Sequence, residues 1–150
     1  MRTCILVGLF VSFAACDENV SPISDTFLPK DYRMTYSEVR DCRRSVDHDL
    51  ANIIVRTSQI ASAAYRGGPY PFPVGSIVVK EEYADPDCRG LLGWTLMRKE
   101  TAGYDPAFGD WRWQKLDRER RVVMDGKVER CRGCHAMPMC KLRDFTCTEP

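Results

Sequence analysis

The sequence has no excess charge of either sign, since 22 lysines and arginines stand against 21 aspartates and glutamates. Proteins that bind nucleic acid usually carry a clear basic surface, so we expect no nucleic-acid partner. The chain also contains no internal repeat and no apolar run of the ~20 residues that a membrane-spanning helix needs. A hydrophobic content of 44% in 150 residues suits one modest domain.

A shorter apolar run covers residues 4–15 and has the length of a signal-peptide core. It ends in F-A-A-C, in which the small residues before Cys16 resemble the bacterial lipobox, where the cysteine is lipidated and becomes the mature N-terminus. We therefore expect residues 1–15 to be a lipoprotein signal peptide and Cys16 to carry lipid. The protein would then be exported and anchored to a membrane, in the periplasm or at the cell surface. Ordinary cleavage nearby, with Cys16 unmodified, is the alternative.

The rest of the chain divides into a tether and a domain. Residues 16–33 contain a stretch rich in Ser, Pro and Asp and are expected to form a flexible tether, and residues 34–150 form the domain. The domain pattern changes from helical to strand-like along the chain and ends in a cysteine-rich segment. This order predicts an α+β, β-rich fold, with N-terminal helices before an antiparallel sheet.

The first half of the domain carries two kinds of periodicity. A helix from Ser37 is predicted by apolar residues at helical spacing, namely Val39, Cys42 and Val46. Residues 52–56 are β-branched and predict a short buried strand, after which Thr57 or Ser58 would cap a small helix reaching Tyr65. One continuous helix over residues 37–65 is the competing interpretation.

The second half of the domain reads as strands. Three are predicted, over residues 76–83, 91–98 and 110–116. A tight hairpin is predicted over residues 121–129, because Asp125-Gly126 suits the positive-φ positions of a two-residue turn.

The segment C-R-G-C-H, residues 131–135, has the spacing of c-type haem attachment. Thiols of Cys131 and Cys134 on one turn can reach the two vinyl groups along a porphyrin edge. His135 then lies beneath the ring, where its imidazole can bind the iron. Export agrees with this interpretation, because bacteria attach c-type haem outside the cytoplasm.

Other uses of the same cysteines stay open. Zinc could take Cys131, Cys134 and His135 with Cys140 or Cys147 as fourth ligand, although thiolates in an oxidising compartment tend to form disulfides. A thioredoxin-like C-x-x-C would need a βαβ pattern, which the sequence lacks around the motif. Structural disulfides with an incidental histidine are the third alternative.

Cys4 leaves with the signal peptide and Cys16 carries lipid, so if Cys131 and Cys134 hold a haem, four cysteines remain for disulfides. Three pairings are open to Cys42, Cys88, Cys140 and Cys147. We prefer Cys140 with Cys147, which closes a short loop, and Cys42 with Cys88, which would tie the first helix to the sheet.

Several blocks of the sequence, in their order and spacing, resemble the cytochrome P-460 domain family and its relative cytochrome c′-beta. The blocks are N-I-I-V at 52–55, P-F-P-V-G-S-I-V-V-K-E at 71–81, G-W-T-L-M-R-K-E at 93–100, G-D-W-R-W-Q at 109–114 and C-R-G-C-H at 131–135. The resemblance implies a β-rich homodimer with one covalent haem c whose iron has an open face. It also implies hydroxylamine or nitric oxide as the small ligand.

The resemblance also assigns two further site residues. In the branch that oxidises hydroxylamine, a lysine in the V-K-E stretch is cross-linked to the haem, and Lys80 is the matching residue. Members active on hydroxylamine place a carboxylate in the next strand, whereas this sequence has Thr95. A threonine hydroxyl can donate or relay a hydrogen bond but is no general base near neutral pH.

The sequence thus predicts an exported, lipid-anchored, mono-haem c-type cytochrome that passes electrons to a partner cytochrome. A cross-linked Lys80 would favour hydroxylamine oxidation. The alternatives are a non-catalytic gas-binding or electron-transfer haem module, and a haem-free lipoprotein rich in disulfides or bearing zinc.

Five other residues invite a haem role but have plainer interpretations. Trp111 and Trp113 alternate on one strand face and are expected in the core. Met97 or Met124 could be a sixth iron ligand, although strand methionines usually fill cores. His48, between two aspartates, is expected at the surface.

Overall fold

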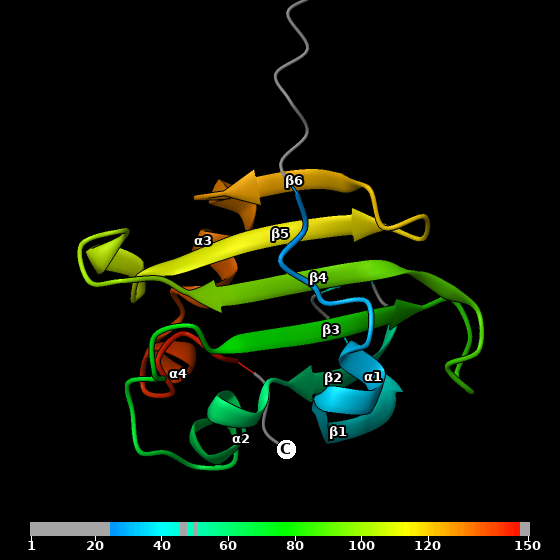
Figure 1. Ribbon diagram of the computed structural model, residues 1–150, viewed down its shortest axis with the longest axis horizontal. Coiled ribbons are helices and arrows are strands. Elements are labelled where there is room, and N and C mark those ends of the chain that lie inside the picture. Colours follow the sequence, from blue (N-terminus) through cyan, green and yellow to red (C-terminus); the bar gives the residue numbers. More distant parts are fainter. Residues whose placement is uncertain (1–24, 46–47, 50, 148–150) are drawn as a thin grey trace, which may run out of the picture.

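The computed structural model describes residues 25–45, 48–49 and 51–147, which form one six-stranded antiparallel sheet with short helices against it (Figure 1). The strands are β1 (Ser37–Arg44), β2 (Asn52–Thr57), β3 (Ile77–Tyr83), β4 (Leu91–Lys99), β5 (Trp111–Asp117) and β6 (Val122–Gly126), lying side by side in chain order. The helices are α1 (Tyr32–Thr35), α2 (Gln59–Tyr65), α3 (Glu129–His135) and α4 (Pro138–Lys141), with a 3-10 turn at Pro106–Phe108. Within these described ranges, no helix is long and apolar enough to cross a membrane.

The β-rich prediction is confirmed, as are its central elements. Strands β2, β3, β4 and β5 and helix α2 fall within one or two residues of their predicted positions. Ser58 is the N-cap residue of α2, and its hydroxyl accepts the backbone N–H of Ile77 at 3.0 Å, which joins the helix start to β3.

The predicted helix from Ser37 is wrong, and with it the continuous helix over residues 37–65. The segment is strand β1, which pairs antiparallel with β2. A register shift between Arg40 and Arg43 marks a β-bulge, and a bulge interrupts the alternation that identifies a strand in sequence. Val39 is buried and Cys42 is half-buried, so their three-residue spacing comes from the irregular strand; Val46 lies outside the described residues.

The predicted hairpin turn at Asp125-Gly126 is also wrong. Both residues belong to β6, and the reversal occurs earlier, between β5 and β6. There the carboxylate of Asp117 accepts the backbone N–H groups of Glu119 at 3.0 Å and Arg121 at 2.9 Å. An aspartate that satisfies turn amides in this way fixes a turn without any glycine.

The last part of the predicted tether, residues 25–33, belongs to the folded domain instead. Leu28 and Tyr32 are each only 3% exposed and pack on one face of the sheet. The side chain of Gln114 in β5 holds the preceding segment, accepting from Phe27 N–H at 3.2 Å and donating to the Asp25 carbonyl at 3.1 Å. The predicted signal peptide, Cys16 and residues 17–24 lie outside the described residues.

Two hydrophobic cores lie on the two faces of the sheet. One face is covered by the N-terminal segment and is called the N-terminal face below. Its core contains Leu28, Tyr32, Val79, Trp94, Leu96 and Leu116. The other face is covered by α2 and the C-terminal segment and contains Val55, Tyr65, Phe72, Val78, Met97, Trp111 and Trp113. The prediction that both tryptophans share one buried strand face is confirmed, with Trp111 0% and Trp113 3% exposed.

Glu81 is a fully buried carboxylate on the N-terminal face. It accepts hydrogen bonds from the hydroxyl of Tyr32, from the hydroxyl of Tyr83 at 2.8 Å and from Arg33 Nε at 2.8 Å. Burial alone would raise the pKa of Glu81, but these donors lower it below its ordinary value. Trp94 Nε1 donates to the Tyr32 hydroxyl at 2.8 Å, so the tyrosine links β4 to the carboxylate.

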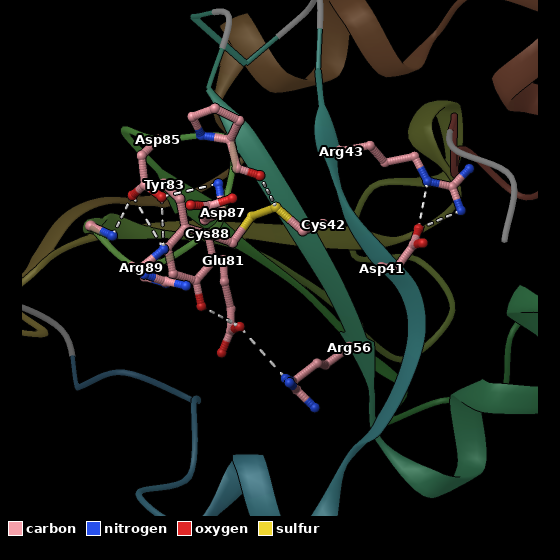
Figure 2. The surroundings of a disulfide bond; sticks show 12 residues. Asp41, Cys42, Arg43, Arg56, Glu81, Tyr83, Asp85, Asp87, Cys88 and Arg89 are labelled. Atoms are coloured by element: carbon pink, nitrogen blue, oxygen red, sulfur yellow. Dashed lines mark hydrogen bonds and ion pairs between the residues drawn. A yellow bond between two sulfur atoms is a disulfide. The ribbon is translucent and has the colours of Figure 1, made fainter.

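A disulfide joins Cys42 in β1 to Cys88 in the loop between β3 and β4 (Figure 2). In the same loop the carboxylate of Asp85 accepts the backbone N–H groups of Asp87 at 3.1 Å and Arg89 at 3.2 Å. A second disulfide joins Cys140 to Cys147. Both disulfides match the preferred pairing. Cys42, however, lies in strand β1 and not in the helix that was expected there.

We expect Tyr32→Phe to lower the free energy of unfolding by about 1–3 kcal/mol, because it removes a donor from buried Glu81 and the acceptor of Trp94 Nε1. Urea denaturation followed by tryptophan fluorescence measures the change. Tyr36→Phe is the matched control, since its hydroxyl makes no hydrogen bond within the described residues; it should alter stability by less than about 0.5 kcal/mol. Equal effects of the two substitutions would contradict the role of Tyr32.

Candidate functional site

Three polar side chains form a row across one face of the sheet. Lys80 of β3 is paired with Thr95 of β4, which is paired in turn with Lys115 of β5. Residues opposite one another on neighbouring strands point to the same face, so the three side chains lie side by side. The adjacent row on this face is apolar and consists of Val78, Met97 and Trp113.

A cavity lies between this face and the C-terminal helices. Its walls include both rows, together with His48, Glu82, Cys131, Cys134, His135 and Met137. The empty space, counted out to the open mouth, is about 1010 Å³. That is at the upper end of what ligand pockets show, and the wall is largely apolar with a few polar groups.

Helix α3 brings the C-R-G-C-H motif to this cavity. Cys131 and Cys134 are three residues apart, so they lie on the same side of the helix. Both are free thiols, whereas the other four described cysteines are paired. Burial raises the pKa of Cys131, so its sulfur is a neutral thiol at neutral pH.

His135 ends α3 and is 7% exposed. Its Nδ1 lies 2.6 Å from the carbonyl oxygen of Phe145, which can only accept, so Nδ1 carries the hydrogen and Nε2 carries the lone pair. The imidazole ring of His135 packs edge-to-face against the ring of Trp113, with 4.5 Å between the two ring centroids. Burial, with the nearby charge of Lys80, lowers the pKa of His135 to about 3, which keeps the imidazole neutral as a metal ligand must be.

A buried ion pair fixes the carbonyl that orients His135. Lys99 Nζ, at the end of β4, lies 2.7 Å and 2.6 Å from the two carboxylate oxygens of Asp144, and both side chains are 8% exposed. Asp144 also accepts the backbone N–H of Phe72 at 2.8 Å, and its own carbonyl accepts Trp111 Nε1 at 2.8 Å. Asp144 therefore joins the segment that contains Phe145 to the sheet.

On the opposite wall, Lys80 belongs to a hydrogen-bonded chain that sequence reasoning missed. Lys80 Nζ lies 3.0 Å from His48 Nε2, and His48 Nδ1 lies 3.2 Å from Glu82 Oε1. The prediction that His48 is a surface residue is wrong, because its side chain is only 18% exposed and lines the cavity. Glu82 could have been found in the sequence, since strand periodicity puts it on the same face as Lys80.

The structure thus brings five predicted site residues to one cavity: Lys80, Thr95, Cys131, Cys134 and His135. Met97 and Met124 also line it, but Met97 belongs to the core, where it is 5% exposed, and Met124 is 41% exposed. Cys147 reaches the wall while paired with Cys140, and the Cys42–Cys88 disulfide is not part of it.

The chemistry of this donor set fits a c-type haem. One neutral imidazole nitrogen and two free thiols border an apolar cavity of sufficient size. The set does not fit zinc, because Cys140 and Cys147 are joined to each other. Within the described ranges no three His, Cys, Asp or Glu side chains gather as a metal site.

The family model described as Cytochrome P460 matches residues 29–148, which is most of the chain. No curated protein matches the sequence. The match begins well before Asn52, where the resemblance seen in the sequence begins, and it includes the row of β3, β4 and β5 residues as well as α3.

We expect Lys99→Met to cost about 3–5 kcal/mol of unfolding free energy, because it leaves the Asp144 carboxylate buried without its cation. Urea denaturation checks this value. The double variant Lys99→Met/Asp144→Asn should recover part of the loss, since it removes the stranded charge.

Arg43→Met is the control for that experiment. Its ion pair with Asp41 is exposed, with 48% and 74% of the two side chains accessible, so the loss should stay below about 1 kcal/mol. A Lys99→Met variant as stable as this control would show that the buried pair does not hold the C-terminal segment.

Proposed function

The chain belongs to the cytochrome P460 family, whose members bind haem, and from this membership we propose that it carries one covalent haem c. Cys131 and Cys134 would hold the haem through thioethers, and His135 would be the iron ligand. The observation that carries the proposal is that two free thiols and the neutral imidazole of His135 border one largely apolar cavity.

The proposed reaction is oxidation of hydroxylamine at the open side of the iron, with nitric oxide as a further ligand. A bound haem of this type supplies an iron that takes small nitrogen ligands and passes electrons onward. Lys80 and Thr95 border the cavity opposite α3, which supports their assignment to the ligand-binding side. Lys80 would be the residue joined to the haem, as the resemblance to hydroxylamine-oxidising members implies.

A non-catalytic haem module that binds nitric oxide or transfers electrons is the second candidate. Thr95 favours it, because this threonine stands where members active on hydroxylamine carry a carboxylate. A hydroxyl at this position can donate a hydrogen bond to a bound gas molecule but cannot accept a substrate proton near neutral pH.

The cellular setting is proposed from the N-terminal sequence and the family. The protein would be exported and held on a membrane by lipid on Cys16, in the periplasm or at the cell surface. An electron-accepting cytochrome would take electrons from the haem. The family resemblance further suggests a homodimer.

Expression with a c-type haem maturation system should give a coloured protein whose haem remains attached after denaturation in alkaline pyridine. Cys131→Ser/Cys134→Ser should abolish the attachment, because no thiol remains to form a thioether. A wild-type protein without covalent haem would contradict the proposal and leave the haem-free lipoprotein.

The ferrous absorption spectrum of the same preparation separates the two haem functions. We expect a strongly red-shifted ferrous band and hydroxylamine consumption in the wild type, with both lost in Lys80→Leu. Lys115→Leu is the matched control, since it removes a lysine from the same row, and it should keep the red shift. An ordinary c-type spectrum in the wild type would favour gas binding or electron transfer.

A further inference from the structure

A second pocket lies beside the cavity that contains the C-R-G-C-H motif. It is found where β3 and β5 end and β4 and β6 begin, at the end of the sheet away from α3 and α4 (Figure 1). Its empty space, counted out to open solvent, is about 800 Å³. Leu92 and Val123 line this pocket and are 52% and 53% exposed, so it is open to the surface. No residue of α3 or α4, both of which the structure describes throughout, lines it.

A wall of polar side chains separates the second pocket from the first cavity. The residues that line both spaces are His48, Asp49, Glu82 and Lys115. Two contacts in the wall are hydrogen bonds: His48 Nδ1 lies 3.2 Å from Glu82 Oε1, and Arg130 Nη2 lies 2.8 Å from Asp49 Oδ1. Lys115 is held more loosely, because its Nζ lies 3.8 Å from Glu82 and 3.9 Å from Asp49, beyond hydrogen-bond distance.

Lys115 is therefore the part of the wall that moves most easily. Its side chain is 33% exposed and consists of a flexible four-carbon stem that ends in the ammonium group. Loose ion pairs in contact with water contribute little to stability, so a rotation about this stem separates Nζ from both carboxylates at low cost. Neither carboxylate is then left unpaired, since Glu82 keeps His48 and Asp49 keeps Arg130.

The position of the haem-attaching helix gives this second pocket a use. A haem held by α3 would enter the first cavity from that side, whereas Lys80, Thr95 and Lys115 form the opposite wall. A small ligand for the open side of the iron has to reach the space in front of this opposite wall. The second pocket ends there, because Glu82 and Lys115 line it as well as the first cavity.

We propose that the second pocket is the route by which small ligands reach the iron, and that Lys115 is its gate. Hydroxylamine, nitric oxide and carbon monoxide are small enough to pass when this one side chain is displaced. The mouth of the first cavity would serve for entry of the haem itself. The inference rests on the proposed function, since it needs a bound haem with an open iron.

The experiment measures how fast carbon monoxide binds to the ferrous holoprotein and leaves it, because this ligand binds iron without any proton transfer. Leu92→Trp and Val123→Trp add a large side chain to the second pocket from β4 and from β6. Each should lower the association and dissociation rates alike, by about tenfold, and leave the Kd unchanged, because a narrower route slows entry and exit equally. A residue that touched the bound ligand would change the Kd.

Lys115→Ala is the opposite change and should raise both rates, since a methyl group in place of the long stem leaves the wall open. The ferrous absorption spectrum should stay that of the wild type in this variant and in both tryptophan variants, because none of the three residues holds the haem.

Two further tryptophan substitutions are the controls. Ile60→Trp adds the same side chain at a position of α2 that is 53% exposed, like Leu92, and lines neither space. Met137→Trp narrows only the first cavity, which Met137 lines while 39% exposed. Both variants should bind carbon monoxide at the wild-type rates.

The outcomes separate this inference from the function on which it rests. Wild-type rates in Leu92→Trp and Val123→Trp, or an equal slowing in Ile60→Trp, would overturn the route and leave the haem function standing. Slower binding in Met137→Trp alone would show that ligands enter by the mouth of the first cavity, with the same consequence. A protein without covalent haem, or one whose ferrous iron binds no carbon monoxide, would overturn the inference together with the proposed function.

Discussion

The buried ion pair between Lys99 and Asp144 is the constraint on which the site depends. Helices α3 and α4 have only seven and four residues, and helices of that length are not stable on their own. They keep their place because Asp144 is bound by β4 and by the Phe72 amide, and because Cys147 is joined to Cys140. The Phe145 carbonyl is placed by the same contacts, and it decides which nitrogen of His135 faces the cavity. A charge pair at the end of β4 therefore helps to set the tautomer of His135 in α3.

The two faces of the sheet use neighbouring carboxylates in opposite ways. Glu81 and Glu82 are adjacent in β3 and consequently point to different sides. Glu81 accepts hydrogen bonds from two tyrosines and one arginine, so it is fully satisfied and holds the N-terminal segment on the sheet. Glu82 meets His48 Nδ1 at 3.2 Å and, at 3.8 Å, Lys115 Nζ. The surroundings of each side chain, and not its residue type, make one carboxylate an anchor for the N-terminal segment and place the other in the cavity wall.

Sequence patterns predicted the parts of the fold that are local and regular. Strands β3, β4 and β5 keep a regular register with one another over most of their length, and the spacing of Cys131, Cys134 and His135 follows from the geometry of a single helical turn. Strand β1 was missed because its bulge disturbs the period on which the prediction relied. The turn at Asp117 was missed because an aspartate side chain replaces the glycine that was sought. His48 was misplaced because its position depends on how β1 and β2 meet β3, which no pattern around residue 48 records.

The carboxylate of this cavity, Glu82, lies on β3, whereas Thr95 occupies the position on β4 where a carboxylate was sought. An antiparallel sheet places the side chains of three strands within reach of one cavity, so the same group can be supplied from β3 or from β4. A search at one aligned position finds only Thr95 and concludes that a base is absent. The sheet register instead puts Glu82 of β3 opposite Gly93 of β4 on the cavity face. The chemistry of such a pocket has to be assigned to a face of the sheet, because the register, and not a single column of sequence, decides which groups meet there.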